Sequence, residues 1–192
     1  EGRTAVKTGA FASFNRHKLT PLLRDAGEWT GEHLIFSSGT ESNASLWRIP
    51  ISSRSRKAEG DPQQLTFSTG VDVHPSAGGG RLVFASTSGN PDLWSLALDA
   101  QGKVTGQMQR LTSNTAGDTS PSVSADGRRV AFISDRSGNP DIWVKDLETG
   151  RETLIFRPPG ADVINNLELS PDGAWLAIAV YDVAARTKTL SV

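Results

Sequence analysis

Short apolar runs separated by polar turns extend along most of the chain. Residues 129–134 have an apolar centre, and residues 141–147 alternate polar and apolar side chains as a half-buried strand does. Asp-Gly at 126–127 precedes the first run, and Ser-Gly-Asn-Pro at 137–140 separates the two, so each run is bounded by turn residues. This pattern predicts units of four short antiparallel strands. No stretch keeps a 3.6-residue period, so at most one helical turn is expected, within residues 19–26.

The pattern repeats. The phrase Ser-Gly-Asn-Pro-Asp-(Leu/Ile)-Trp occurs at 88–94 and again at 137–143. Leu-Thr recurs at 65–66 and 111–112, with a weak third copy at 153–155. Four turn glycines are each followed five residues later by an apolar anchor, and the glycine–anchor pairs are Gly31–Phe36, Gly79–Phe84, Gly127–Phe132 and Gly173–Ile178. A period of about 40 to 50 residues indicates a repeat architecture.

Four strands in a unit of about 46 residues are typical of a β-propeller blade. A single blade cannot bury both faces of its sheet, so blades stack face to face. We therefore interpret the recurring aromatic residues as a core between blades, and a ligand-stacking role for the tryptophans is the alternative. These residues are Phe36, Trp47, Phe84, Trp94, Phe132 and Trp143. Asp92 and Asp141, in the repeated turn, are expected to bind backbone amides within their blades.

The spacing divides the chain into blades and predicts an unfinished ring. Full blades are expected at 29–66, 67–112 and 113–156, a partial blade at 157–192, and strands of a preceding blade within 1–28, at 3–7 and 10–14. The third strand of the last unit should centre near Thr189. The predicted fold is thus all-β, with about three full four-stranded antiparallel blades and two partial ones. Propellers need several blades to close, so we expect a fragment of a six- to eight-bladed ring, completed by a longer chain or by a second copy.

The third unit resembles the TolB-like (WD40-like) propeller repeat. The consensus of that family is close to Ser-Pro-Asp-Gly, an apolar strand, Ser-Asp-Arg-x-Gly-x-x-Asp-Ile-Trp/Tyr and then Leu-Thr. Residues 134–143 and the Ser-Pro-Asp-Gly at 170–173 match it, whereas the second unit lacks the Asp-Gly and Asp-Arg pairs. The resemblance covers about residues 29–181. It implies a bacterial, periplasmic or otherwise extracytoplasmic setting, and residues 46–51 with the insertion at 99–106 also resemble propeller parts of large sensor kinases and regulators.

Composition limits the partners. The chain has 192 residues and a net charge of −1, so it lacks the general positive charge that attracts nucleic acid. No apolar run reaches the 18 to 20 residues of a membrane span, so direct membrane insertion is not expected. Cysteine is absent, which excludes disulfides and thiolate chemistry. Because the sequence begins with Glu1 rather than Met, we expect it to be a segment of a longer protein.

Motifs for catalysis are missing from the sequence. Gly-x-Ser-x-Gly does not occur, and His17, His33 and His74 are far apart, without metal-ligand spacing. The glycines at 78–80 precede no Lys-Ser/Thr pair, so they indicate a hairpin turn rather than a phosphate loop. We therefore predict that this segment is not an enzyme.

The candidate binding residues lie where the innermost strands begin. Asp-Val-His-Pro at 72–75 and Asp-Thr-Ser-Pro at 118–121 recur 46 residues apart, with Asn-Asn at 165–166 near the equivalent place. In a propeller these positions line one mouth of the central channel. The predicted ring is Asp72, His74, Asp118, Asn165 and Asn166, which suits backbone amides of a peptide or a cation. The simpler alternative is that the aspartates accept hydrogen bonds within turns.

The sequence therefore favours a non-catalytic scaffold that binds a protein or peptide, or a sensory domain. No cofactor is expected, apart from a possible channel cation such as calcium. Two alternatives stay open: the propeller gate of a prolyl-oligopeptidase-type serine peptidase, and a metal-binding propeller enzyme.

Overall fold

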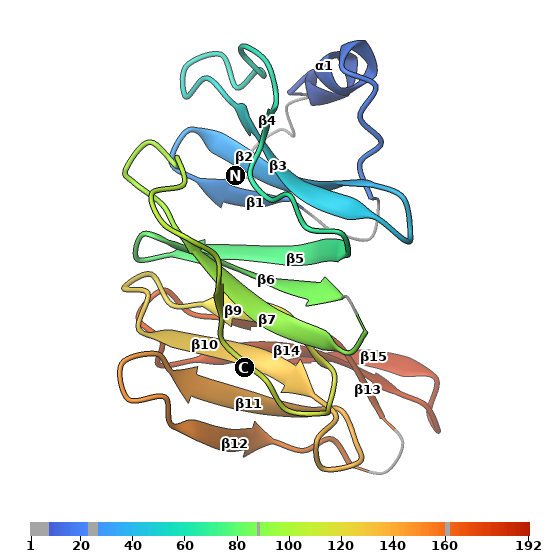
Figure 1. Ribbon diagram of the computed structural model, residues 1–192. Helices are drawn as coiled ribbons and strands as arrows, with labels where there is room; N and C mark the ends of the chain where they lie inside the picture. The colour runs from blue at the N-terminus through green and yellow to red at the C-terminus, as the bar shows by residue number, and fades with distance from the viewer. Residues whose placement is uncertain (1–7, 23–26, 88, 160–161) are drawn as a thin grey trace.

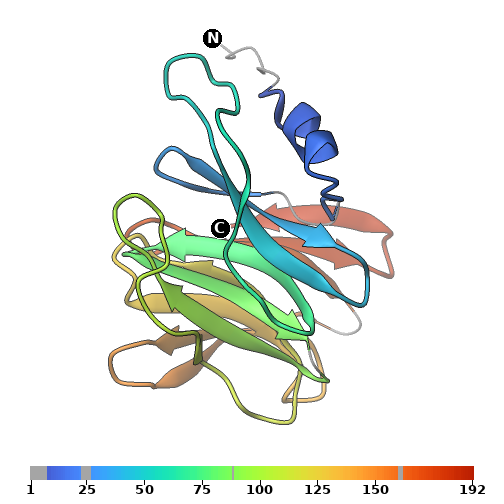
Figure 2. The ribbon, with the colours of Figure 1, turned by 45° about the horizontal axis from the view of Figure 1, so that its top comes forward.

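The computed structural model describes residues 8–22, 27–87, 89–159 and 162–192 (Figures 1 and 2). Blade 1 contains β1 (Glu28–Thr30), β2 (His33–Gly39), β3 (Ala44–Pro50) and β4 (Gln63–Gln64). Blade 2 contains β5 (Val71–Gly78), β6 (Arg81–Thr87), β7 (Pro91–Ala97) and β8 (Gln109–Arg110). Blade 3 contains β9 (Asp118–Val123), β10 (Arg129–Ser134), β11 (Asp141–Asp146) and β12 (Glu152–Phe156). Blade 4 contains β13 (Val163–Leu169), β14 (Leu176–Asp182) and β15 (Thr187–Ser191).

Consecutive strands within each blade pair antiparallel, and the blades follow one another without closing a ring (Figure 2). The all-β propeller fold is thus confirmed. The third strand of blade 4 is centred on Thr189, where the repeat spacing predicts it. No helix in the described ranges is long and apolar enough to cross a membrane.

The repeated aromatic residues form cross-strand pairs on one face of blades 1, 2 and 3. Phe36 lies opposite Trp47, Phe84 opposite Trp94, and Phe132 opposite Trp143. Each phenylalanine is at least 95% buried. Neighbouring aromatic pairs stabilise antiparallel sheets, so the same pair can serve every blade.

Three apolar clusters fill the spaces between successive blades. Phe84 packs with Ile35 and Leu46 between blades 1 and 2, and Phe132 packs with Val83 between blades 2 and 3. Ile178, the anchor of blade 4, packs with Ile142 of blade 3. The aromatic pairs of blades 2 and 3 therefore lie in cores between blades, because each blade covers the face of the next, whereas Phe36 and Trp47 of blade 1 belong to a fourth cluster.

The first described element is a helix, α1 (Ala10–Arg16), where the sequence predicts a strand at 10–14. That expectation is wrong. Ala10 and Phe14, one helical turn apart, pack on Phe36, and the Phe14 and Phe36 rings are 4.4 Å apart between centroids. The helix thus occupies the face on which a preceding blade would pack. The other expected strand, at 3–7, lies outside the described residues.

The weak Leu-Thr copy at 153–155 is also misplaced. Thr66 and Thr112 accept hydrogen bonds through Oγ1 from the backbone N–H groups of Leu46 and Leu93, at 2.9 and 3.0 Å. In blade 3, a register shift on β11 places Phe156 opposite Ile142. Phe156 therefore takes the place of the leucine, because its side chain packs in the core between blades 3 and 4.

A central cavity between the inner strands

The inner strands of all four blades converge on one cavity of about 350 Å³, which we call the central cavity. It lies among β1, β5, β9 and β13. Its lining is mainly polar, and the lining residues are Gly27, Glu28, His74, Pro75, Ser76, Ser120, Pro121, Asn165, Asn166, Leu167 and Glu168. The structure therefore brings together His74, Asn165 and Asn166 of the predicted ring.

Three of the inner strands, β5, β9 and β13, contain predicted site residues, and each of the three has a bulge at the cavity. The register shifts between Val73 and Ser76 of β5, along β9, and between Ile164 and Asn166 of β13. His74 and Ser120 adopt positive φ angles of 53° and 50°, which are unfavourable for residues with a Cβ. Each is followed by a proline, which cannot donate to the strand ladder. The bulges interrupt the pleat and re-aim these side chains at the cavity.

Asp72 and Asp118 are fully buried and are not among the residues that line the central cavity. Asp72 accepts hydrogen bonds from the hydroxyls of Ser68 and Ser86, both at 2.6 Å. Asp118 accepts from Asn114 at 3.0 Å and pairs with Arg136 at 3.3 Å. These contacts join the start of each inner strand to neighbouring segments of the same blade.

Asp92 and Asp141 pair with arginine rather than with backbone amides. Asp92 pairs with Arg110 at 2.5 Å. Asp141 accepts from Arg157 at 2.9 Å, and this contact together with the Ser137 hydroxyl holds the pKa of Asp141 below its usual value against the effect of burial. Both ion pairs tie the repeated turn to the outer part of the same blade.

A repeated hydrogen bond connects adjacent inner strands. The Ser76 hydroxyl accepts from the Val123 N–H at 2.9 Å, and the Ser122 hydroxyl accepts from the Leu169 N–H at 2.8 Å. Between blades 1 and 2, the Glu28 carboxylate accepts from the Ala77 N–H. These hydrogen bonds hold adjacent inner strands side by side around the central cavity.

Two carboxyl groups in the central cavity were not predicted from the sequence. Burial raises the pKa of Glu28 to about 7, and the charge of Glu168 adds to this effect, while the Ala77 N–H opposes it. Burial also raises the pKa of Glu168, although a hydrogen bond with Ser122 opposes the shift. A signal existed, because Glu168 lies 46 residues after Ser122, which lies 46 after Ser76. Glu168 thus occupies the position of the serine that bonds the next blade.

The cavity offers carboxyl, amide, hydroxyl and imidazole groups. Such a set suits hydrogen bonding to peptide groups or contact with a cationic side chain. No group of three or more His, Cys, Asp or Glu residues within the described ranges is arranged to hold a metal ion.

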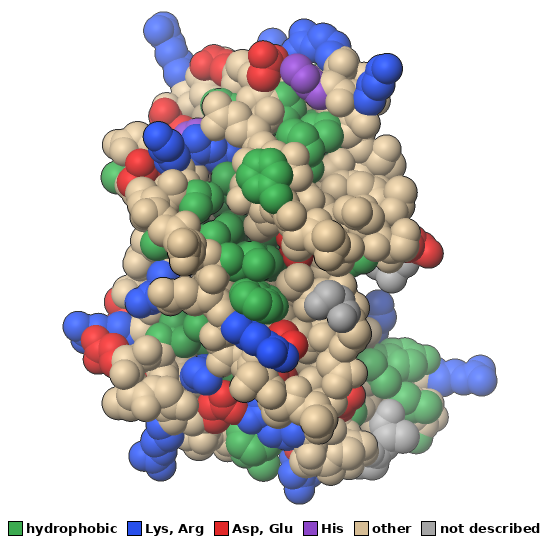
Figure 3. All heavy atoms as spheres, viewed as in Figure 1, with side chains coloured by type: hydrophobic (Ala, Val, Ile, Leu, Met, Phe, Trp, Pro, Cys, Tyr) green, Lys and Arg blue, Asp and Glu red, His purple; other side chains and the backbone are tan. Residues whose placement is uncertain are grey.

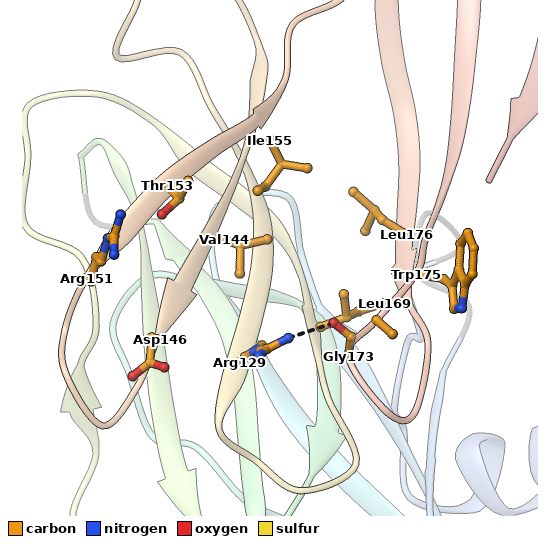
Figure 4. Close-up of a pocket in the computed structure, with 11 residues that line it drawn as sticks. Arg129, Val144, Asp146, Arg151, Thr153, Ile155, Leu169, Gly173, Trp175 and Leu176 are labelled. Carbon is orange, nitrogen blue, oxygen red and sulfur yellow. Dashed lines mark hydrogen bonds between the residues drawn. The ribbon is translucent and has the colours of Figure 1, made fainter.

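A second cavity, of about 400 Å³, lies on the outside between blades 3 and 4 (Figure 4). Ile155 of β12 and Leu176 of β14 point toward it from opposite sides. Arg129 closes one end by donating a 3.0 Å hydrogen bond to the Gly173 carbonyl. Trp175 is 65% exposed beside it.

Comparisons with known proteins agree with the resemblance of the repeat motif. No family model matches the chain. A TolB homologue from Chlorobium luteolum is 34% identical over 152 residues, which cover 77% of this chain and 31% of the relative. The Tol-Pal system protein TolB of Desulfosudis oleivorans is 35% identical over 102 residues, or 53% of this chain and 20% of the relative. The chain spans less than a third of the length of these two relatives.

Solved structures show the same fold. TolB from Acinetobacter baumannii has a TM-score of 0.62 at 21% identity, over 86% of this chain and 42% of that chain. A puromycin-hydrolysing peptidase from Mycobacterium tuberculosis has a TM-score of 0.59 at 12% identity, over 86% and 28%. The fold is therefore shared by TolB and by an enzyme, and the fold alone does not assign an activity. The repeat motifs and the curated relatives are more specific, and together they support a TolB-like β-propeller family for this chain.

Proposed function

We propose that this chain is part of a non-catalytic propeller that binds a segment of a partner protein at the central cavity. One observation carries the proposal: four inner strands direct polar side chains into a single cavity in a TolB-like propeller. The bulged strands support it, because a positive φ at His74 and Ser120 costs stability that packing alone does not require.

The chemistry of the cavity favours a peptide occupant. Asn165 and Asn166 can donate to and accept from backbone amides, and both are exposed beside the cavity. Glu28 and Glu168 favour a basic side chain or N–H donors near the same place. Binding a cation lowers the pKa of a neighbouring carboxyl, so a basic partner would bind these groups in their ionised form.

The relatives suggest the setting. Since two curated relatives are TolB proteins, one of them named for the Tol-Pal system, we propose a periplasmic partner of the Pal type. Attachment to a sensor kinase stays a prediction from sequence resemblance.

We also propose that a further blade of a longer chain covers blade 4. Leu190 is 72% exposed. It lies opposite Ala179 of β14, and the neighbour of Ala179 in that strand, Ile178, faces blade 3. Because successive side chains of a strand point to opposite faces, Ala179 and Leu190 lie on the face that points away from blade 3. Glu168 supports this proposal, since the serines at its position accept an N–H from the following inner strand.

The test is calorimetric titration of the protein with the purified Pal domain from the same bacterium. We expect saturable binding that Asn166→Arg weakens about tenfold or more, because the guanidinium fills the cavity and alters its charge. The control is Lys188→Ala, an exposed change on β15, which should leave the affinity unchanged. Absence of binding by the unaltered protein would contradict the partner, and equal affinity of the Asn166→Arg variant would contradict the site.

A further inference from the structure

A groove separate from the central cavity lies on the outer side of blades 1 and 2, and we call it the rim groove. It has a volume of about 510 Å³. The segment after β4 forms one wall, and the segment before β8 forms the other (Figure 1). Leu65 and Leu96 lie buried at its base. Figure 3 shows hydrophobic side chains gathered in a stripe near the middle of this side of the molecule.

One wall carries an aromatic residue that the fold does not need. Phe67 is 79% exposed and lines the rim groove. The equivalent position of the next repeat, one residue after Leu-Thr, is Ser113, which is also exposed. Since a serine serves the same place in blade 2, packing of the blade does not explain a phenylalanine here. Large exposed apolar side chains that cluster mark interaction surfaces.

The other wall is an insertion that the repeat does not need either. Residues 98–108 join β7 to β8, whereas residues 147–151 make the same connection in blade 3. The insertion is anchored, because Leu98 pairs with Val104 and Arg48 donates a 2.9 Å hydrogen bond to the Gln101 carbonyl. It presents Met108, which is 37% exposed, toward the groove. A preformed wall reduces the entropy lost when a ligand binds.

The charges of the groove are of one sign. Among its described lining residues only Arg48 and Lys103 are charged, and neither forms an ion pair with a described carboxylate. Arg48 donates to Gln63 and Gln101, which fixes its guanidinium at the edge of the apolar base. Lys103 is exposed on the opposite wall. The groove thus combines an apolar base with two cationic edges.

We propose that the rim groove is a second docking site, which binds an extended segment of a partner protein carrying apolar side chains beside carboxylates. The apolar side chains pack between Phe67 and Met108. The carboxylates pair with Lys103 and with the free N–H groups of Arg48. Charge complementarity selects this occupant over a basic or neutral one. The site is independent of the central cavity, since the two share no lining residue.

The experiment uses fluorescence anisotropy with the peptide Asp-Leu-Asp-Leu-Asp-amide, labelled with fluorescein on its N-terminal amine. We expect saturable binding, with chemical-shift changes confined to amides of the groove, which are those of residues 48, 63–68, 96 and 103–108. Phe67→Ser, which copies the neighbouring repeat, should weaken binding about tenfold, because it removes a large apolar contact. Lys103→Glu should weaken it by about the same factor, and the loss should shrink at high salt.

Matched controls separate the groove from surface effects. Leu190→Ser removes an exposed apolar residue and Lys188→Glu reverses an exposed charge, both on β15, and neither should change the affinity. The lysine version of the peptide should not bind. Equal binding of the two peptides, unchanged affinity in both groove variants, or shifts mapped elsewhere would overturn the proposal. Self-association of the protein that Phe67→Ser abolishes would also overturn it, since the occupant would then be a second copy.

Discussion

The two ends of the blade stack differ in what covers their outward faces. At blade 1, the outward face carries Phe36 and is covered by α1, with Phe14 packed on it. At blade 4, the outward face carries Leu190, which is 72% exposed. Figure 2 shows α1 beside blade 1 and the sheet of blade 4 at the other end of the chain. A helix can therefore cover the outward face of a blade in place of another blade, as at blade 1, whereas Leu190 on the outward face of blade 4 stays exposed.

This difference in cover predicts a difference in local stability along the stack of blades. Blades 2 and 3 are packed on both faces, so their central strands should unfold only with the whole domain. The last blade has one packed face, and Leu190 on its other face is exposed. Four substitutions sharpen this comparison.

The largest effect is expected from Phe132→Ala, between blades 2 and 3. Phe132 is fully buried, so truncation leaves a cavity and should lower the free energy of unfolding by about 3–5 kcal/mol. Urea unfolding followed by tryptophan fluorescence measures it. A loss below 1 kcal/mol would contradict a continuous core between these blades.

At the covered end, Phe14→Ala should lower the free energy of unfolding by about 2 kcal/mol, because α1 loses its main contact with Phe36. The variant should also expose Phe36 and bind more of a hydrophobic dye. Asn15→Ala, at the next and exposed position of the same helix, is the control for changes in helix propensity. Equal dye binding by the two variants would show that α1 does not act as a cover.

The two ends also meet at the central cavity, through Glu28 of blade 1 and Glu168 of blade 4. The pKa of Glu28 is raised from 4.5 to about 7, so between these values the folded state binds more protons than the unfolded state. The free energy of unfolding therefore falls as the pH rises through this window. Glu28→Gln should remove about 1–2 kcal/mol of that fall, after allowance for solvent screening. Thermal unfolding at pH 4.5 and pH 8 tests this, with the exposed Glu32→Gln as control, and an unchanged pH profile would argue against the raised pKa.

The smallest effect is expected at the open end. Leu190→Ser should change the free energy of unfolding by less than about 0.5 kcal/mol, because an exposed side chain loses little burial. The same change at a fully buried core leucine such as Leu82 should be severe. A large loss at Leu190 would mean that its face is already covered.

The repeat made most of the fold predictable. The anchors Phe84 and Phe132 recur at a fixed period and have to face a neighbouring blade, so the sequence alone locates the cores. Helix α1 was missed because it is only seven residues long and its start carries no capping signal: Gly9 precedes it with no side-chain cap, and no acidic residue lies in its first turn. Its contact with Phe36, a tertiary effect, decides its conformation.

The central cavity was only partly predictable. His74 and the two asparagines follow from the position of the inner strands. Glu28 and Glu168 were missed because they lie outside the Asp-x-x-Pro segments, and only the folded chain shows that they share the cavity. Asp72 and Asp118 share the repeat position but are turned into their blades, since the bulges that follow them change which side chains face inward.

Hydrogen exchange of β2 against β14 tests the central comparison most directly. Both strands pair with neighbours on two sides, so they differ mainly in the cover of the outward face. We predict that β2 exchanges as slowly as β6 and β10, that β14 exchanges at least about tenfold faster, and that Phe14→Ala accelerates β2 alone. Equal protection of β2 and β14, with no effect of Phe14→Ala, would contradict the account.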